Sequence, residues 1–246
     1  MTTSTTARHQ RKRPLMPIYV PTCCPHDWQA LLADPIKQWQ PECSAMAMAQ
    51  SWESAKDLPP EIYELLSPLF PDVKLLIALP EHKVPLPGSN LGASQNDVFA
   101  LLRSKDRTIA MTVEGKVDEP FDSPLGKWLK NASVGKRRRL AYLCEMLRLR
   151  EQPPDDVYYQ LLHRAASALI EAERFKTDAA AMIVHSFSLD DRWFFAFQRF
   201  VSLLGIENVE IGKLVRIDLE PRPIFLGWAK GDPKFREDLG RACALT

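Results

Sequence analysis

The sequence predicts a mixed α/β fold in which a central mixed β-sheet is flanked by helices. Two short apolar segments, residues 97–102 and 108–117, are separated by a single polar break, which is typical of a β-hairpin. A continuous apolar segment, residues 179–185, has the character of a central strand that is buried on both faces. Segments with helical periodicity lie before the hairpin, and also between the hairpin and this strand.

The elements before the hairpin are predicted from periodicity and from proline. Apolar residues recur at helical spacing from Ser44, a suitable N-cap, to about Leu66, and Pro59-Pro60 divides this stretch into two helices. Residues 73–79 are expected to form a buried strand, and residues 80–92 a loop rich in proline and glycine. A long loop inside a compact domain is often functional, and this one leads directly into the hairpin.

After the hairpin, helices and strands are expected to alternate. A helix opens near Gly135, and Asp155 or Asp156 can cap a second helix that ends near Phe175. A third helix is expected from Trp193 to about Leu204, with aromatic residues that belong to the core. The expected strands are residues 179–185, 214–219 and 224–229.

Composition excludes several classes of protein. The chain has 246 residues, of which 46% are hydrophobic, so it can bury a substantial core in one domain with extensions. Its net charge is +1, so any nucleic-acid surface must be local. No apolar run approaches the ~20 residues that span a bilayer, and the polar N-terminus is unlike a signal peptide, so no membrane association is predicted. The five cysteines show no disulfide framework, which favours a reducing, cytoplasmic location.

Residues 1–43 are expected to form a basic N-terminal arm and an extended segment, and residues 44–246 a single domain. Several cations between Arg8 and Arg13 precede a proline-punctuated stretch. Such an arm can contact phosphates, although most basic tails are simply solvated. Cys23-Cys24 and Cys43 do not match the usual spacing of a zinc knuckle, so no zinc site is predicted.

The second strand of the hairpin carries an acid and an amine on one face. With the strand period of two, Glu114 and Lys116 point to the same side, together with Ala110 and Thr112. The opposite side is apolar and consists of Ile109, Met111, Val113 and Val117. An acid and a lysine two residues apart usually form a solvated ion pair, but the flanking residues here are too apolar for an ordinary wet edge.

The length of the hairpin loop decides whether a second carboxylate joins this pair. A two-residue loop at Lys105-Asp106, or a four-residue loop at 104–107, places Asp97 directly across from Glu114, whereas an odd-numbered loop would turn Asp97 away. Opposed carboxylates with Cβ atoms about 5 Å apart repel unless a cation or a proton lies between them. A hard ion such as Mg²⁺, with Mn²⁺ as a substitute, takes one or two carboxylates and keeps several waters. We therefore predict a metal site on Asp97 and Glu114, where Lys116 orients a water or stabilises phosphate charge.

At this point the chain resembles the restriction-endonuclease-like superfamily, also called PD-(D/E)XK nucleases. In that family an αβββαβ core places an aspartate at the start of one strand and Glu-x-Lys on the next, and these groups bind Mg²⁺ and activate water for phosphodiester cleavage. The resemblance covers about residues 44–188, with Asp97, Glu114 and Lys116 in the signature positions, and leaves residues 189–246 as a C-terminal extension with a further helix and strands. Asn96 stands where the family has a proline before the aspartate.

The resemblance implies further site residues and a partner. Some members of the family add a glutamate from the first helix and a glutamine or a basic residue from the helix after Glu-x-Lys. Glu53 would then be a further metal ligand and Gln160 a further catalytic residue. DNA or another nucleic acid is the implied partner, and its backbone would be contacted by Lys136, Arg137, Arg138, Arg139 and Arg164. A solvated helix face is the alternative for the run from Lys136 to Arg139.

Three functional hypotheses follow from the sequence. The leading one is a metal-dependent nuclease that hydrolyses phosphodiester bonds in DNA or another nucleic acid with a Mg²⁺-activated water. The alternative is a catalytically inactive protein of the same fold that acts as a nucleic-acid- or protein-binding, regulatory module. The third is a hydrolase of another kind, whose nucleophile the sequence does not identify. The sequence leaves open whether the chain forms a homodimer.

Overall fold

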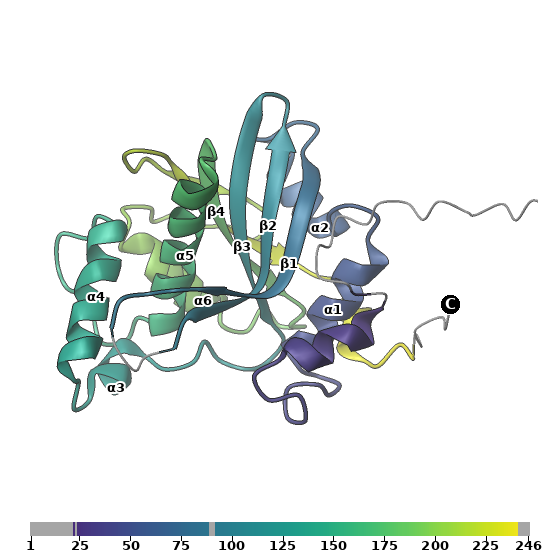
Figure 1. Cartoon of the computed structure of the whole chain (residues 1–246), viewed down its shortest axis with the longest axis horizontal. Helices are drawn as coiled ribbons and strands as arrows, with labels where there is room; N and C mark the ends of the chain where they lie inside the picture. Colours follow the sequence, from purple (N-terminus) through teal and green to yellow (C-terminus); the bar gives the residue numbers. More distant parts are fainter. Residues whose placement is uncertain (1–21, 23, 89–91, 241–246) are drawn as a thin grey trace, which may run out of the picture.

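The computed structural model describes residue 22, residues 24–88 and residues 92–240. Within these residues, six strands form one sheet in the order β1-β2-β3-β4-β6-β5, and helices cover both of its faces (Figure 1). The predicted fold class, a mixed α/β protein with a central mixed sheet flanked by helices, is therefore confirmed. The N-terminal arm up to residue 21 and Cys23 lie outside the described residues.

The sheet combines an antiparallel meander with a parallel centre. β2 runs antiparallel to both β1 and β3, β4 is parallel to β3, β6 is parallel to β4, and β5 runs antiparallel to β6. A parallel step needs a long crossover, and the segment with α5 supplies it between β3 and β4. The strands are β1 (Lys74–Val84), β2 (Ser94–Ser104), β3 (Arg107–Lys116), β4 (Ala179–Ser186), β5 (Val215–Ile217) and β6 (Ile224–Lys230).

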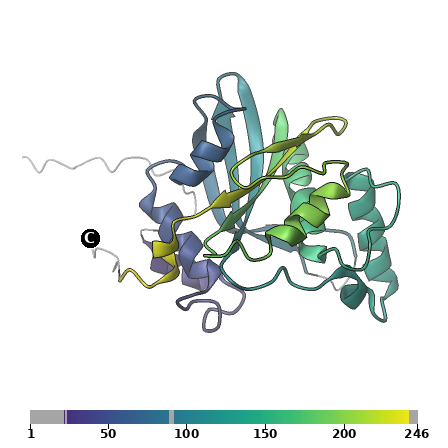
Figure 2. The ribbon, with the colours of Figure 1, turned by 180° about the vertical axis from the view of Figure 1, so that it is seen from behind.

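The helices are divided between the two faces of the sheet. Figure 1 shows α1 and α2 on one side and α4 and α5 on the other, and α6 is seen best from behind in Figure 2. The helices are α1 (Ser44–Ser54), α2 (Pro60–Leu66), α3 (Leu125–Leu129), α4 (Val134–Met146), α5 (Tyr159–Phe175) and α6 (Phe194–Ser202), with short 3₁₀ helices η1 (Pro25–Leu31) and η2 (Pro233–Arg236).

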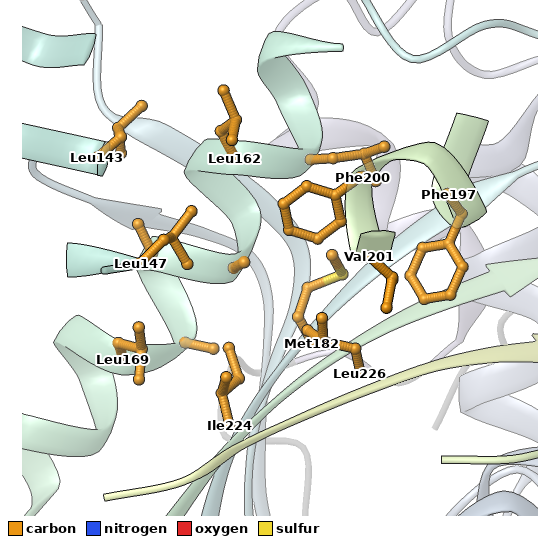
Figure 3. Packing of buried hydrophobic residues seen from close by; sticks show 14 of the residues in the cluster. Leu143, Leu147, Leu162, Leu169, Met182, Phe197, Phe200, Val201, Ile224 and Leu226 are labelled. Carbon is orange, nitrogen blue, oxygen red and sulfur yellow. The ribbon is translucent and has the colours of Figure 1, made fainter. Parts of the chain in front are cut away.

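Each face of the sheet has its own hydrophobic core. Figure 3 shows leucines of α4 and α5 and phenylalanines of α6 meeting Met182 of β4 and Leu226 of β6. The opposite core joins α1 and α2 to the other side of the same strands, including Ile109, Met111 and Val113 of β3. The predicted division of β3 into two faces is thus observed. Every residue of β4 is buried, which explains its continuous apolar sequence.

Element boundaries depart from the sequence prediction at several places. β1 continues to Val84 through the stretch expected to be a loop, and Pro80 pairs with Val98. Proline is tolerated there because β1 is an edge strand. Cys43, not Ser44, is the N-cap of α1. α5 begins at Tyr159, later than caps at Asp155 or Asp156 would place it, and α3 was not predicted.

The described residues directly before α1, 24–43, pack against the domain and include a helix, where an extended segment was expected. Its residues 25–31 form the 3₁₀ helix η1, with Pro25 at the start and Trp28 only 1% exposed in the core beside α1. Among the described cysteines, Cys43 and Cys144 are free thiols, whereas Cys24 is disulfide-bonded, which the cysteine spacing did not predict.

The C-terminal extension contributes two strands to the sheet, and the residues after these strands are hydrogen-bonded to α1. β5 and β6 extend the sheet beyond β4. Further on, the Gln50 side chain donates to the carbonyl oxygens of Phe235 (3.1 Å) and Glu237 (2.8 Å) and accepts from the Leu239 N–H (2.9 Å). The extension is therefore integral to the domain. Of the helices in the described part of the chain, none is long and apolar enough to cross a membrane.

Candidate functional site

The β2–β3 hairpin has the predicted even-numbered loop. β2 ends at Ser104 and β3 begins at Arg107, and the paired residues run from that turn to Val98 opposite Val113. One step further along this register, Asp97 comes opposite Glu114. Regular pairing stops there, and Asp97 Oδ2 instead accepts a hydrogen bond of 2.7 Å from the Gly115 N–H. The end of the hairpin therefore fixes the orientation of one carboxylate relative to the next strand.

Both carboxylates line one cavity of about 470 Å³ at this end of the sheet. Lys116 of β3, and Gln160 and Arg164 of α5, line the same cavity. The lining also includes the segment from Glu42 to Ala45, which leads into α1. Five of the residues predicted for the site are thus brought together, namely Asp97, Glu114, Lys116, Gln160 and Arg164.

Glu114 is held between two buried cations. Its Oε1 lies 2.5 Å from Lys116 Nζ, and its Oε2 lies 2.5 Å from Arg164 Nε. Burial of Glu114, which is 2% exposed, would raise its pKa, but the charges of Arg164 and Lys116 lower the pKa below the usual value. Glu114 is therefore ionised, and Lys116 is further fixed over the ring of Phe121 at 5.0 Å.

The pKa of Asp97 is shifted in the opposite direction to that of Glu114. Burial, and then the charges of Glu114 and Glu81, raise the pKa of Asp97 well above its usual value. Glu81 of β1 also lines the cavity, and the β1–β2 register brings it opposite Asp97. Gln95 Nε2 donates to Glu81 Oε2 at 2.6 Å, and burial is the main cause that raises the pKa of Glu81 to about 7. Three strands therefore bring three acids into one row.

Arg164 connects the cavity to a polar cluster behind it. Its Nη1 donates to Ser94 Oγ at 3.0 Å and lies 3.3 Å from His163 Nδ1. Ser94 Oγ in turn lies 2.8 Å from His163 Nδ1. Burial and the charge of Arg164 lower the pKa of His163 well below its usual value, so this imidazole is neutral. The Nη1 group of Arg164 therefore contacts the Ser94 hydroxyl and the His163 ring, while its Nε group contacts Glu114.

Glu53 does not join the site, contrary to the sequence prediction. The cavity meets the first turn of α1, at Ser44 and Ala45, whereas Glu53 lies in the last turn. With a rise of about 1.5 Å per residue, these positions are about 13 Å apart along the helix. Glu53 Oε1 accepts a hydrogen bond of 2.7 Å from Trp28 Nε1, so its role is to fix η1 against α1.

The basic run on α4 is divided between the interior and the surface. Arg139 is 4% exposed and donates to the carbonyl oxygens of Pro87 (2.8 Å) and Gly92 (2.8 Å), so the predicted phosphate contact by Arg139 is replaced by a structural role. Four consecutive helical residues cannot share one face, because each is rotated by about 100° from the last. Lys136 donates to the Trp128 carbonyl oxygen at 2.6 Å.

The two remaining residues of the run face outward. Arg137 and Arg138 are exposed, although Arg137 Nη2 also donates to the Ala132 carbonyl oxygen at 2.9 Å. Arg164, by contrast, is 6% exposed and bound to Glu114, so it is not available as predicted to track a nucleic-acid backbone. Any contact of this region with phosphates depends on the outward-facing side chains.

Sequence reasoning missed Glu81, Ser94 and His163. Glu81 was assigned to a loop because Pro80 precedes it, and only the β1–β2 register aligns Glu81 with Asp97. His163 is adjacent to Arg164 on α5, but helical periodicity gives no reason to pair it with Ser94, which is distant in sequence. The polar run from Ser94 to Asp97, directly before the apolar residues of the strand, is the signal that could have indicated Ser94.

The glycine between Glu114 and Lys116 is required by close packing. A Cβ atom at Gly115 would lie 2.4 Å from Met48 Cγ and 3.2 Å from Asp97 Oδ2. Gly115→Ala is therefore expected to lower the free energy of unfolding by about 1–3 kcal/mol through overpacking. Urea denaturation would measure this, with Gly92→Ala as the matched control because a Cβ there meets nothing within 4 Å. Equal stability of the two variants would contradict the packing argument.

The donor set suits a small, hard divalent ion. Asp97 and Glu114 offer carboxylate oxygens to one cavity, and Gln160 Oε1 is buried without a hydrogen-bond partner. Among residues 24–88 and 92–240, no group of three or more His, Cys, Asp or Glu side chains is arranged to hold a metal. Mg²⁺ commonly uses one or two carboxylates and completes its coordination with water, so the two carboxylates fit this ion, and the Gln160 amide oxygen could accept a hydrogen bond from one of its waters.

Fold and site define a mixed α/β protein with a cavity, lined by Asp97, Glu114 and Lys116, at the end of its central hairpin. Residues 21–233 match the model of a family described as a domain of unknown function, DUF6946, and the chain belongs to this family. No curated protein and no solved structure matches the chain.

Proposed function

We propose that this protein is a metal-dependent nuclease that hydrolyses phosphodiester bonds in DNA or another nucleic acid. The observation that carries the proposal is the convergence of Asp97, Glu114 and Lys116 in one cavity, with Gln160 beside them. An acid from each of two neighbouring strands and a buried amine form a site for a divalent cation and a phosphate together.

Each side chain of the cavity has a definite role in this proposal. Asp97, oriented by the Gly115 N–H, and Glu114 would hold Mg²⁺ or Mn²⁺. When bound, such an ion lowers the pKa of a coordinated water and offsets charge on the scissile phosphate. Lys116, fixed by Glu114 and by the Phe121 ring, would stabilise the negative charge that develops on the phosphate. The unpaired Gln160 Oε1 would accept a hydrogen bond from the attacking water.

Element order also supports a relationship to the restriction-endonuclease-like superfamily. A helix precedes three antiparallel strands, and a helix then leads to a fourth strand that is parallel to the third. The aspartate and the Glu-x-Lys motif lie on the second and third strands, as in that superfamily. We infer membership from this order together with the shared cavity.

The proposal is tested by incubating the purified chain with single- and double-stranded DNA and RNA and Mg²⁺ or Mn²⁺. We expect cleavage that a chelator abolishes, and a loss of at least about 100-fold in Lys116→Ala. Lys127→Ala on α3 is the control, because Lys127 is exposed and outside the cavity. Circular dichroism would establish that both variants are folded, and full activity of Lys116→Ala would contradict the proposal.

One observation favours the alternative, a binding or regulatory module of the same fold. Lys116 and Arg164 already neutralise Glu114, so the carboxylate is satisfied without a metal ion. Under this alternative, nucleic acid or a protein partner binds but no divalent ion produces turnover. Binding measured by fluorescence anisotropy, without any cleavage in the assay above, is the result expected of such a module.

A further inference from the structure

We propose that Arg164 is a resident cation of the cavity, which must leave Glu114 before a divalent ion can bind there. This inference rests on the proposed function, because it concerns the same metal site. It assigns Arg164 a positioning role that controls access of the ion, in place of the phosphate contact expected from the sequence.

The first observation is that the two oxygens of Glu114 are already in use. Lys116 Nζ contacts Oε1 and Arg164 Nε contacts Oε2, each at 2.5 Å. All three side chains are buried, with 2%, 3% and 6% of the residue exposed for Glu114, Lys116 and Arg164. Water therefore screens these charges poorly. Both oxygens of Glu114 already have a cationic partner when a divalent ion enters the cavity.

A divalent ion bound to Glu114 would lie close to the positive charge of Arg164. Mg²⁺ binds a carboxylate oxygen at about 2.0–2.1 Å, so an ion on Oε2 would lie within a few ångströms of the guanidinium. Two cations that close repel strongly in a buried site. Two other acids that line the cavity, Asp97 and Glu81, already accept hydrogen bonds from the Gly115 N–H and from the Gln95 amide. The ion and Arg164 therefore compete for Glu114.

The third observation is that Arg164, unlike Lys116, has another place to bind. Ser94 Oγ already accepts from its Nη1 at 3.0 Å, and neutral His163 lies on the same side. The backbone of Arg164 is fixed, because its carbonyl oxygen accepts from Thr112 Oγ1 at 3.1 Å. The side chain can therefore turn toward Ser94 while helix α5 stays in place. Lys116 is held on its own strand between Glu114 and Phe121.

The test measures Mn²⁺ binding by electron paramagnetic resonance, without nucleic acid and without an activity readout. Arg164→Gln removes the competing charge and is expected to bind Mn²⁺ at least tenfold more tightly than the natural protein. Arg199→Gln is the matched control, since Arg199 forms an exposed ion pair with Asp156 outside this cavity. Equal or weaker Mn²⁺ binding by Arg164→Gln than by the natural protein would overturn the inference.

Ser94→Ala provides an independent variant in case Arg164→Gln does not fold. It removes the acceptor that receives the guanidinium, so the expected result is Mn²⁺ binding weakened several-fold, and unchanged binding would overturn the inference. The two proposals can fail separately. If the natural protein and Arg164→Gln bind Mn²⁺ equally, only the resident-cation inference fails. If neither binds Mn²⁺ at millimolar concentration, the inference and the metal-dependent function both fail.

Discussion

Glu114→Gln is expected to lower the free energy of unfolding by about 3–5 kcal/mol, because it leaves two buried cations without their common counter-charge. The glutamine is similar in size, so little packing is lost. What changes is that Lys116 Nζ and the Arg164 guanidinium, each now 2.5 Å from a carboxylate oxygen, would face a neutral amide. Urea denaturation monitored by tryptophan fluorescence would measure the loss.

Two further variants separate the electrostatic cause from other causes. Glu173→Gln removes the acid that Lys176 and Arg222 share at the surface, and its effect on stability should be far smaller than that of Glu114→Gln, because water screens the charge of the exposed Glu173. The double variant Glu114→Gln with Arg164→Gln should be more stable than the sum of the single changes predicts, because one unpaired charge is gone. If the free-energy losses of the two single variants simply add up in the double variant, charge is not the cause of the loss in Glu114→Gln.

Glu81→Gln is expected to make the protein more stable above pH 7, by up to about 3 kcal/mol. Burial, the main cause, raises the pKa of Glu81 from its usual 4.5 to about 7. The folded state therefore binds this proton more tightly than the unfolded state does. The stability that the proton contributes is fully present below pH 4.5 and is lost as the pH rises through about 7. Glutamine has no proton to lose, so the variant escapes this loss.

The measurement is the free energy of unfolding of both proteins at several values between pH 4.5 and pH 8.5. The difference between Glu81→Gln and the natural protein should be smallest at pH 4.5 and grow to a plateau above pH 7. Glu64→Gln is a suitable control, since Glu64 is exposed on α2. A difference that does not vary with pH would show that Glu81 titrates normally and is not confined beside Asp97.

Local sequence patterns predicted the parts of the fold that depend on neighbouring residues. The hairpin is an example, because alternation and a short polar turn specify both strands, and the structure has the even-numbered loop on which the predicted register depended. The buried strand β4 and the amphipathic helix α5 were identifiable for the same reason. The relation of α5 to the hairpin followed only from the family resemblance, yet Gln160 does line the cavity.

Sequence patterns did not predict the contacts of side chains whose partners are distant in the sequence. Glu53 and Arg139 both look like surface charges in sequence, but Trp28 binds the first and backbone carbonyl oxygens of the chain before β2 bind the second. Arg164 reads as an ordinary basic residue of a helix. Its partner, Glu114, is fifty positions away in the chain, and only the packing of α5 on β3 brings the two together.

The sequence alone determined the fold class, the two strands of the hairpin and the face that Glu114 and Lys116 share, because strand period and a polar turn are local properties. The even-numbered hairpin loop, which the sequence left open, is a finding of the structure. Only the tertiary structure decided which charges remain free. In the folded chain, Arg164 is buried against Glu114, Glu81 lies opposite Asp97, and Glu53 lies outside the site. The physical reason is that desolvation and ion pairing depend on which distant side chains share a cavity, and these partners are set by how the helices pack on the sheet.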